Sequence, residues 1–500
     1  MRDKWQMANG KWQILLLAGI LLLAAFLRLY RISDYMTFLG DEGRDVLVVK
    51  RMLIDHKFTL LGPTASVGGF FLGPIYYYFM LPFLWVFRLD PVGPAIMVAL
   101  FGIATVLLIY KVGQDFFDQK TGLVAALLYA LSPLVIAYSR SSWNPNLMPF
   151  FSLLIIWLTW KTIIENKPMF LILVGFFFGI AIQLHYLVTF LMVIVGVYLF
   201  FFYRKKLTTY YLLLTTSFLL GWLPFLLFEL RHSFPNLRTL YQFIFFGKET
   251  GLVTQRFISI MTDVTFRLFN RLVTNNYEML ANILLIASLS LFIFLWLRNR
   301  RDEKLFKTYS LIGLWLVLGI CLFGFYQKPI YDYYFGFMFS LPFLLVGLTF
   351  SYLFSLKSLP IKVAAVCLLG TILWVNWQGR PFRFTPNRQL DQTKTISRFV
   401  LDKTEGNSFN FALITGQNSD HAYRYFFEIW GNKPVTIENL QVDPQRKTVT
   451  GQLLVICEVS DCKPLGHSLW EIAGFGRAEI EGEWPVSVVK VFKLGHYREP

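Results

Sequence analysis

An acidic pair, Asp41-Glu42, lies in the segment Thr37-Phe38-Leu39-Gly40-Asp41-Glu42-Gly43-Arg44, shortly after the first long apolar stretch of the chain. A carboxylate can act as a general base that takes a proton from a hydroxyl or an amine. The local sequence alone favours a structural role. Asp41 is a suitable N-cap for a helix over about 42–56, and Glu42 in the first turn would favour the helix dipole. The local sequence leaves both roles open.

Four basic residues could bind a phosphate group. Arg140, Arg231 and Lys328 lie at the ends of later apolar stretches. Arg256 lies in a long loop, residues 231–277, between two of these stretches. A guanidinium can hold a phosphate through two parallel hydrogen bonds. The alternative for each is a long side chain whose stem lies in the apolar region and whose charge reaches water.

Polar and aromatic residues that could contact a sugar or an acceptor lie at the same ends: Asn144, His185, Tyr331 and Tyr334. The alternatives are a helix cap for the asparagine and an aromatic belt at the membrane interface for the tyrosines. His185 could act as an acid, a base, a metal ligand or an interfacial polar residue. A lone histidine does not define a metal site, so metal binding stays open.

The elements that position these residues are membrane spans. Of the 500 residues, 55% are hydrophobic and 18% aromatic, and apolar runs of spanning length recur up to about residue 377. We predict eleven spans, at about 12–29, 94–112, 120–138, 146–164, 168–183, 186–203, 210–229, 278–298, 306–326, 333–354 and 360–377. The apolar stretch 74–89 contains Pro82 and is predicted to be a juxtamembrane or re-entrant helix. A variant with thirteen spans stays open.

Charge orients the chain. The net charge is +16, but residues 378–500 hold 15 basic and 14 acidic residues, so almost the whole excess lies in residues 1–377. The near-neutral tail argues against a nucleic-acid partner, whereas basic turns such as Arg204-Lys205-Lys206 predict cytoplasmic loops and contacts with membrane lipids. The N-terminus is therefore expected in the cytoplasm. Three segments are expected outside it: loop 30–73 with the acidic pair, loop 231–277 and the C-terminal tail. The first span lacks a cleavage site and is read as an anchor.

Loop 231–277 has six basic residues and two acidic ones. Apolar residues from Val253 to Leu272 recur at helical spacing, with Arg256, Asp263, Arg267 and Arg271 on the other face, which predicts an amphipathic helix on the membrane surface.

The tail, 378–500, reads as a small α/β domain. We expect helices over 389–404 and 420–430 and strands over 409–415, 452–458 and 486–494. Cys457 and Cys462 lie in this tail, where a disulfide is open if the tail is outside the cytoplasm.

Several short motifs, in this order, resemble one family. They are the Asp41-Glu42 pair in the first outer loop, Gly73-Pro74-Ile75-Tyr76-Tyr77-Tyr78, Leu131-Ser132-Pro133 before Tyr138-Ser139-Arg140, and the segment from Tyr331 to Pro342. Over residues 10–377 the chain resembles the membrane-embedded glycosyltransferases of the GT-C fold, which include the protein O-mannosyltransferases and the enzymes that move aminoarabinose onto lipid A.

The resemblance implies a polyprenyl-phosphate-sugar donor, inversion at the anomeric carbon, and a protein, lipid or glycan acceptor. Asp41 matches the catalytic acidic position and would be the general base, with Glu42 positioning it. The basic residues would stabilise the leaving phosphate, and Tyr76 would join the sugar or acceptor contacts. These implications make the chain a multi-pass glycosyltransferase of a bacterial plasma membrane.

The chain departs from the family after Arg140, where Trp143-Asn144-Pro145-Asn146 replaces a turn that commonly carries an acidic residue. Whether the site contains a second carboxylate, and whether a divalent metal binds to it, therefore stay open. The rival functions are a carrier or flippase for lipid-linked sugars, or a polymerase or ligase of surface polysaccharide. A carrier would show internal repeats and charges within its spans, and neither is evident.

Overall fold

In the computed structural model, all residues are described except 1, 66–68, 204–206, 247–253, 327 and 498–500. The basic turn Arg204-Lys205-Lys206 and Val253, both used in the sequence predictions, lie outside the described residues. The chain divides into two compact units. Unit 1 comprises residues 1–30, 59–79 and 95–385, and unit 2 comprises residues 31–58, 80–94 and 386–500. Unit 2 therefore takes in part of the first loop together with the tail.

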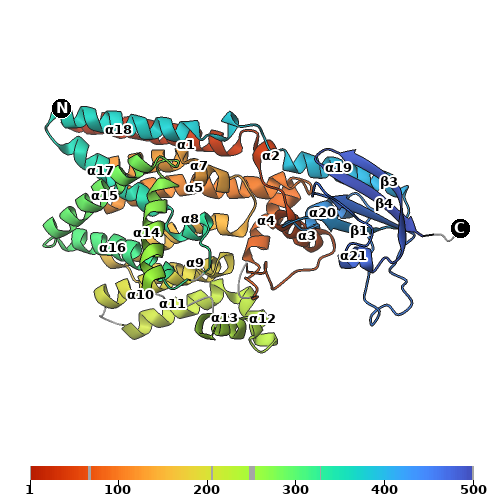
Figure 1. The fold of residues 1–500 in the computed structure, drawn as a ribbon. Coiled ribbons are helices and arrows are strands. Elements are labelled where there is room, and N and C mark those ends of the chain that lie inside the picture. Colours follow the sequence, from red (N-terminus) through yellow and green to blue (C-terminus); the bar gives the residue numbers. More distant parts are fainter. Residues whose placement is uncertain (1, 66–68, 204–206, 247–253, 327, 498–500) are drawn as a thin grey trace. The chain divides into compact units, whose positions relative to one another are not determined.

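Unit 1 is almost entirely helical (Figure 1). Six of its helices are long and apolar enough to cross a membrane within the described residues. They are α1 (Arg2–Leu29, apolar from Trp12), α5 (Val92–Phe116, which begins in unit 2), η1 with α8 (Asn144–Leu147 and Met148–Ile164), α15 (Glu278–Arg298), α16 (Glu303–Phe323) and α18 (Leu359–Gln378). All six overlap predicted spans, which confirms a polytopic helical membrane protein.

Two further predicted spans are broken helices. α11 (Leu207–Gly221) meets α12 (Leu223–Arg231) at a bend of 80°, and η2 (Asp332–Met338) meets α17 (Ser340–Ser355) at 59°. Counting each pair as one span gives up to eight spans among the described residues. The other three predicted spans correspond to shorter helices, namely α6 (Gln119–Leu131) with α7 (Pro133–Tyr138), α9 (Phe170–Leu184) and α10 (Val188–Phe202). A total of eleven crossings stays a prediction.

Small residues set the closest helix packing in unit 1. Gly175 and Gly179 lie one turn apart on α9, facing α11. A Cβ at Gly175 would lie 2.2 Å from the carbonyl oxygen of Leu214, and one at Gly179 would lie 2.3 Å from that of Phe218. This spacing of small residues lets the backbones of membrane helices approach closely.

The amphipathic helix predicted in loop 231–277 is present as α14 (Thr254–Asn270), preceded by α13 (Pro235–Phe246). Its apolar residues Val264 and Leu268 are buried, and α14 packs against α15 and α16. Neighbouring helices of the protein therefore cover part of its apolar face, and a position of α14 on the membrane surface stays a prediction.

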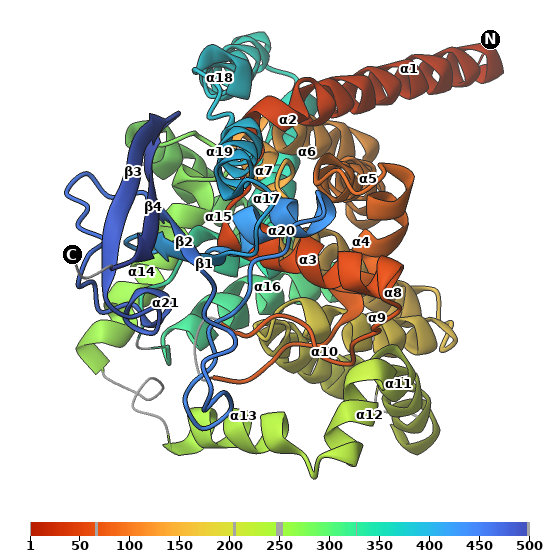
Figure 2. The same cartoon turned by 90° about the vertical axis from the view of Figure 1, so that its right-hand side faces the viewer.

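Unit 2 is built on a four-stranded sheet in the order β1-β2-β4-β3 (Figure 2). Its strands are β1 (Asn410–Ile414), β2 (Gln452–Cys457), β3 (Ala478–Val486) and β4 (Val489–His496). β1 and β2 are parallel, with Leu413 opposite Ile456, whereas β4 is antiparallel to both β2 and β3. The single strand predicted over 486–494 is in fact part of a hairpin of β3 and β4.

Both faces of this sheet are covered. Phe411 and Leu413 pack with α19 (Gln389–Thr404) and α20 (His421–Ile429), whereas Ala412 and Ile414 point to the other face, which includes α21 (Trp470–Ala473). This alternation is the period of two expected for a strand. Cys457 and Cys462 form a disulfide at the end of β2. Unit 2 also contains α2 (Ile32–Tyr35), α3 (Gly40–Ile54) and most of α4 (Ile75–Val86), the predicted juxtamembrane helix with Pro82 inside it.

Candidate active site

The acidic pair lies in the first turn of α3, in unit 2. The helix begins at Gly40, so its N-cap is Leu39, and the prediction that Asp41 is the N-cap is wrong. The Asp41 side chain is 55% exposed and accepts a hydrogen bond from Arg44 Nη1 (2.9 Å). Glu42 is only 6% exposed, and its Oε2 accepts the N–H of Leu39 (3.0 Å). Glu42 is therefore the residue that caps the helix, whereas Asp41 faces outward.

Burial governs the charge of Glu42. Burial is the main reason that the pKa of this carboxyl is raised to about 7; the backbone N–H groups of Leu39 and of Glu42 itself oppose the rise, and the nearby charges of Asp41 and Asp45 add to it. Near neutral pH the pair therefore combines one exposed carboxylate with one carboxyl close to its midpoint. Such a pair can position a proton acceptor without placing two full negative charges side by side.

Arg44 and Asp45 belong to the same site, although the sequence analysis gave them no role. Asp45 is fully buried and accepts from Arg44 Nε (2.9 Å) and Nη2 (2.8 Å). Arg44 thus joins Asp41 to Asp45 and fixes the direction of the Asp41 side chain. The sequence does hold a signal for the ion pair, because Asp41 and Arg44 are three residues apart and so lie on the same side of a helix.

The start of α20 packs against this turn. A Cβ added at Gly40 would lie 2.0 Å from Ser419 Oγ, and one at Gly43 would lie 2.3 Å from the backbone nitrogen of Ala422. Ser419 Oγ also lies 2.8 Å from His421 Nδ1. Burial, together with the charges of Arg44 and Arg424, lowers the pKa of His421, while Asp420 and Asp41 oppose this. The imidazole is therefore neutral at neutral pH.

In unit 1, several predicted sugar or acceptor residues gather around two turns. The hydroxyl groups of Tyr76 and Ser142 lie 2.7 Å apart. Asn144 Nδ2 donates to the carbonyl oxygen of Leu184 (2.6 Å), directly before His185. The turn that carries Asn144 is therefore joined to α4 and to the end of α9. The buried Asn144 amide has a structural partner, and a sugar contact by Asn144 stays a prediction.

His185 lies in an aromatic cluster, which we define as Trp143, His185, Tyr186, Tyr326, Tyr331, Tyr333 and Tyr334. Ring centroids are 5.4 Å apart for His185 and Tyr334, and 5.8 Å apart for Tyr331 and Tyr334. Tyr334 is buried, whereas Tyr331 is exposed. The structure thus brings together three of the predicted contact residues, from α9 and from the start of η2. Aromatic rings with hydroxyl groups can stack on a sugar and hydrogen-bond to it.

An ion-pair group holds the turn that carries these tyrosines. Asp332, at the start of η2, accepts from Arg267 Nη2 and from Arg271 Nε (2.8 Å), and Arg267 Nη1 donates to the carbonyl oxygen of Ile330 (2.9 Å). The sequence analysis placed Arg267 on the polar face of an amphipathic helix but did not identify this role. Residues 332 and 267 are too far apart in sequence for spacing to reveal the pair.

The predicted phosphate ligands do not form one group. Arg140 is fully buried, and its Nη1 and Nη2 donate to the carbonyl oxygens of Leu27 (2.8 Å) and Tyr30 (3.0 Å), so it caps the end of α1. Arg231, Arg256 and Lys328 are exposed, on α12, on α14 and in the turn before Tyr331, respectively. Phosphate binding by these four residues stays a prediction.

Among the described residues, no group of three or more His, Cys, Asp or Glu side chains is arranged to hold a metal ion. The sequence prediction left a divalent metal open, and we assign no metal ligand.

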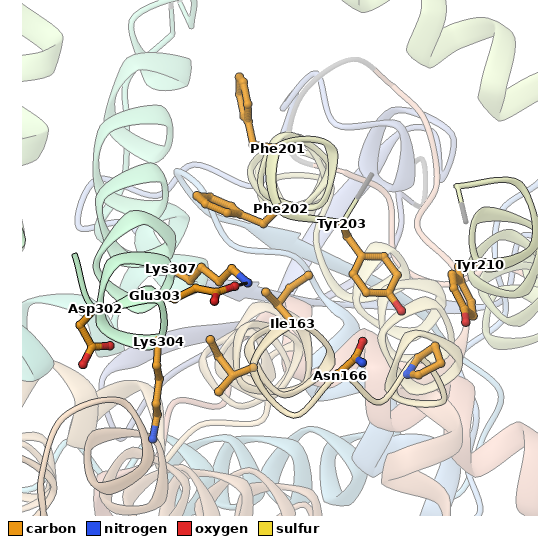
Figure 3. Close-up of a pocket in the computed structure, with 12 residues that line it drawn as sticks. Ile163, Asn166, Phe201, Phe202, Tyr203, Tyr210, Asp302, Glu303, Lys304 and Lys307 are labelled. Carbon is orange, nitrogen blue, oxygen red and sulfur yellow. Dashed lines mark hydrogen bonds and ion pairs between the residues drawn. The ribbon is translucent and has the colours of Figure 1, made fainter. Parts of the chain in front are cut away.

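A cavity of about 1150 Å³ lies elsewhere in unit 1 (Figure 3). It is lined by Ile163, Ile164, Asn166, Pro168, Phe201, Phe202, Tyr203, Tyr210, Asp302, Glu303, Lys304 and Lys307. Lys307 pairs with Glu303 there. α10 begins three residues after His185 and ends at this cavity. Its 15 residues separate the cavity from the aromatic cluster by roughly 20 Å, so we do not assign the reaction to the cavity.

This architecture matches solved membrane glycosyltransferases. ArnT from Cupriavidus metallidurans, bound to undecaprenyl phosphate, superposes with a TM-score of 0.65, covering 97% of this chain and 98% of that one at 11% identity. The oligosaccharyltransferase of Archaeoglobus fulgidus, in complex with Zn and sulfate, gives a TM-score of 0.51, covering 88% of this chain and 67% of that one at 12% identity. The chain therefore has the GT-C fold that the sequence resemblance predicts.

Sequence comparison agrees over part of the chain. Residues 72–228 match the model of the dolichyl-phosphate-mannose-protein mannosyltransferase family. A protein of Bacillus subtilis (strain 168) named "Putative mannosyltransferase YkcB" is 27% identical over 164 residues, which are 32% of this chain and 22% of that protein. The match thus spans less than a quarter of the relative. In fold and in this partial sequence match, the chain is thus similar to membrane glycosyltransferases.

Proposed function

We propose that this protein is an inverting glycosyltransferase that moves a sugar from a polyprenyl-phosphate donor to an acceptor at the outer face of the plasma membrane. The observation that carries the proposal is the exposed Asp41 carboxylate beside the buried Glu42, at the start of a helix in the first loop. The likeness to an ArnT structure bound to undecaprenyl phosphate supports the class of donor.

In the proposed reaction, Asp41 accepts the proton of the acceptor hydroxyl or amine. The acceptor oxygen or nitrogen bonds to the anomeric carbon while the bond from that carbon to the phosphate oxygen breaks. The products are the glycosylated acceptor and the polyprenyl phosphate, and this single displacement inverts the anomeric carbon. Glu42 supports Asp41, because its carboxyl, partly protonated near neutral pH, limits the repulsion beside the base.

For unit 1 we propose a role in donor binding. Tyr331 and Tyr334 contact the sugar, and Lys328, exposed three residues before Tyr331, binds the leaving phosphate. A cation at a developing phosphate charge is a large source of rate enhancement. Asp332 contributes indirectly, because it fixes the turn that carries both tyrosines.

The disulfide between Cys457 and Cys462 supports an outer location for the tail, because disulfides persist in oxidising compartments. With the tail outside the cytoplasm, the acidic pair in the same compact unit is on that side as well.

The test is transfer by the purified protein. It is incubated with polyprenyl phosphates that carry labelled hexoses or pentoses, mannose first, and with a membrane extract as the source of acceptors. We expect label to move from one donor to a protein, lipid or glycan, and the anomeric configuration of the product to be opposite to that of the donor. Absence of transfer, with donor moved across vesicles that contain the protein, would refute the proposal and favour a carrier.

A further inference from the structure

One side chain of the tail contacts the backbone of the acidic turn. Asn418 Oδ1 accepts the N–H of Gly40 (2.9 Å), the residue directly before Asp41. The N-cap residue of α3, Leu39, has no oxygen in its side chain to accept a hydrogen bond. Asn418, distant in sequence, therefore pairs one of the first N–H groups of α3, which have no partner within the helix.

Asn418 is held in turn by Glu458. Its Nδ2 donates to Glu458 Oε1 (3.0 Å) and Oε2 (3.2 Å). The same carboxylate accepts from the hydroxyls of Thr415 (2.7 Å) and Tyr423 (2.9 Å). Both ends of the Asn418 amide are thus occupied, which fixes its orientation. Burial, and next the charge of Glu458, raises the pKa of Tyr423, so its hydroxyl remains a donor across the working pH range.

Glu458 itself directly follows strand β2. Its backbone N–H donates to the carbonyl oxygen of Ile414 (2.9 Å), and the preceding residue, Cys457, is held by the disulfide to Cys462. The series of hydrogen bonds from Glu458 through Asn418 to Gly40 is therefore attached to the end of β2, an inner strand of the sheet. It ends at the helix turn that carries Asp41 and Glu42.

The backbone at the start of α3 also lies close to the segment that begins α20. Glycines at positions 40 and 43 let the turn approach Ser419 and Ala422, where any larger residue would collide. α3 and α20 therefore have little freedom to slide against each other. A shift of the Asn418 segment would move the start of α3 as well.

We propose that Asn418 and Glu458 are positioning residues for Asp41 and Glu42, so that the tail takes part in the reaction by aligning the general base. This inference rests on the proposed function, in which Asp41 is that base. A misplacement of about 1 Å can lower a rate by on the order of 100-fold, so loss of the hydrogen bond to Gly40 should lower kcat more than donor binding.

The experiment compares Asn418→Ala with a matched control, Asn410→Ala. Asn410 is a buried asparagine of the same tail: its Nδ2 donates to the carbonyl oxygens of Val435 (2.8 Å) and Thr448 (2.9 Å), its Oδ1 accepts from Thr450, and none of these hydrogen bonds goes to α3. Both variants lose an asparagine that stabilises the tail. Asn418→Ala should lower kcat by at least about tenfold and leave the donor KM within about twofold, while Asn410→Ala should change kcat little.

A double variant tests the geometry by rescue. Asn418→Asp keeps an acceptor for Gly40 but faces the Glu458 carboxylate, so kcat should fall. Adding Glu458→Gln supplies an amide nitrogen that can donate to the new carboxylate, while its single oxygen keeps one of the two hydroxyl donors, Thr415 or Tyr423, so kcat should recover at least in part. Equal losses of kcat in Asn418→Ala and Asn410→Ala would overturn the inference, and so would a double variant no better than Asn418→Asp alone.

Hydrogen exchange separates this inference from the proposed function. In Asn418→Ala the amides of residues 39–43 should exchange faster than in the wild type, and in Asn410→Ala they should not. Wild-type protein that transfers no sugar from any donor would refute the proposed function. The exchange measurement would still decide the inference, because unchanged exchange at residues 39–43 overturns it.

Discussion

Replacing Glu42 with glutamine should remove a pH dependence of stability that the buried carboxyl creates. Glu42 is 6% exposed, and its Oε2 accepts the N–H of Leu39. Glutamine has nearly the same shape and retains an oxygen for that hydrogen bond, but it does not ionise. Comparing the wild type with Glu42→Gln therefore isolates the effect of ionising the Glu42 carboxyl.

The magnitude follows from the pKa. Burial raises the pKa of Glu42 from its ordinary value of 4.5 to about 7. Because the pKa in the folded state lies above that of the unfolded chain, the contribution to stability is fully present below about pH 4.5 and is lost as pH rises through about 7. The difference between the two pKa values corresponds to a total loss of about 3 kcal/mol in the free energy of unfolding. Roughly 2–3 kcal/mol of this loss falls between pH 5 and pH 8.

The assay is hydrogen exchange of residues 39–43 in the wild type and in Glu42→Gln, measured at pH 5, 6, 7 and 8. Comparison at equal pH cancels the intrinsic pH dependence of exchange. The wild-type amides should exchange faster than those of the variant, by a ratio that grows by about 30- to 100-fold between pH 5 and pH 8. A ratio that is constant over this range would show that Glu42 does not titrate there and would refute the reasoning.

Three further substitutions test other parts of the structure. Gly43→Ala places a Cβ 2.3 Å from the backbone of Ala422 and should destabilise unit 2 by about 1–3 kcal/mol in chemical denaturation, whereas Gly416→Ala, which meets no atom within 4 Å, should change stability by less than about 0.5 kcal/mol. If the two variants are equally stable, the close α3–α20 contact is wrong. Asp332→Asn should lower stability by about 1–2 kcal/mol, because two partly exposed arginines lose their shared carboxylate, and thermal denaturation indistinguishable from wild type would contradict this. Arg140→Met should lower stability by about 1–3 kcal/mol, because the α1 carbonyl oxygens lose their donors, and Arg140→Lys should restore only part of it. A stable Arg140→Met variant that has lost only donor binding would instead assign Arg140 to the phosphate.

The sequence predicts the helices and most of the tail because the hydrophobic period is local information. α19, α20, β1 and β2 begin and end within one or two residues of their predicted bounds. β3 was missed because it contains Gly482 and Pro485, which are unfavourable within a strand. The sheet order places β3 at an edge, where a proline is tolerated.

The residues of the candidate site also fall into two groups, those that local sequence predicts and those that it does not. The acidic pair could be predicted from residue type and position, and the structure shows that Glu42 caps the helix while Asp41 stays exposed. Asn418, which accepts the N–H of Gly40, and Glu458, which holds Asn418, could not be predicted, because Asn418 is 378 residues from Gly40, Glu458 lies farther still, and no short-range pattern joins them. Arg140 was interpreted from its chemistry alone, whereas its buried surroundings give it carbonyl partners.

The central claim, that Asp41 is the general base, is tested most directly by kcat for sugar transfer in Asp41→Asn. The pair of Asp41 with Arg44 is exposed, so its loss should change stability by less than about 1 kcal/mol. If Asp41 is the base, kcat should fall by about 100- to 10,000-fold, with the donor KM nearly unchanged and the variant as stable as the wild type. A kcat within about threefold of wild type would contradict it.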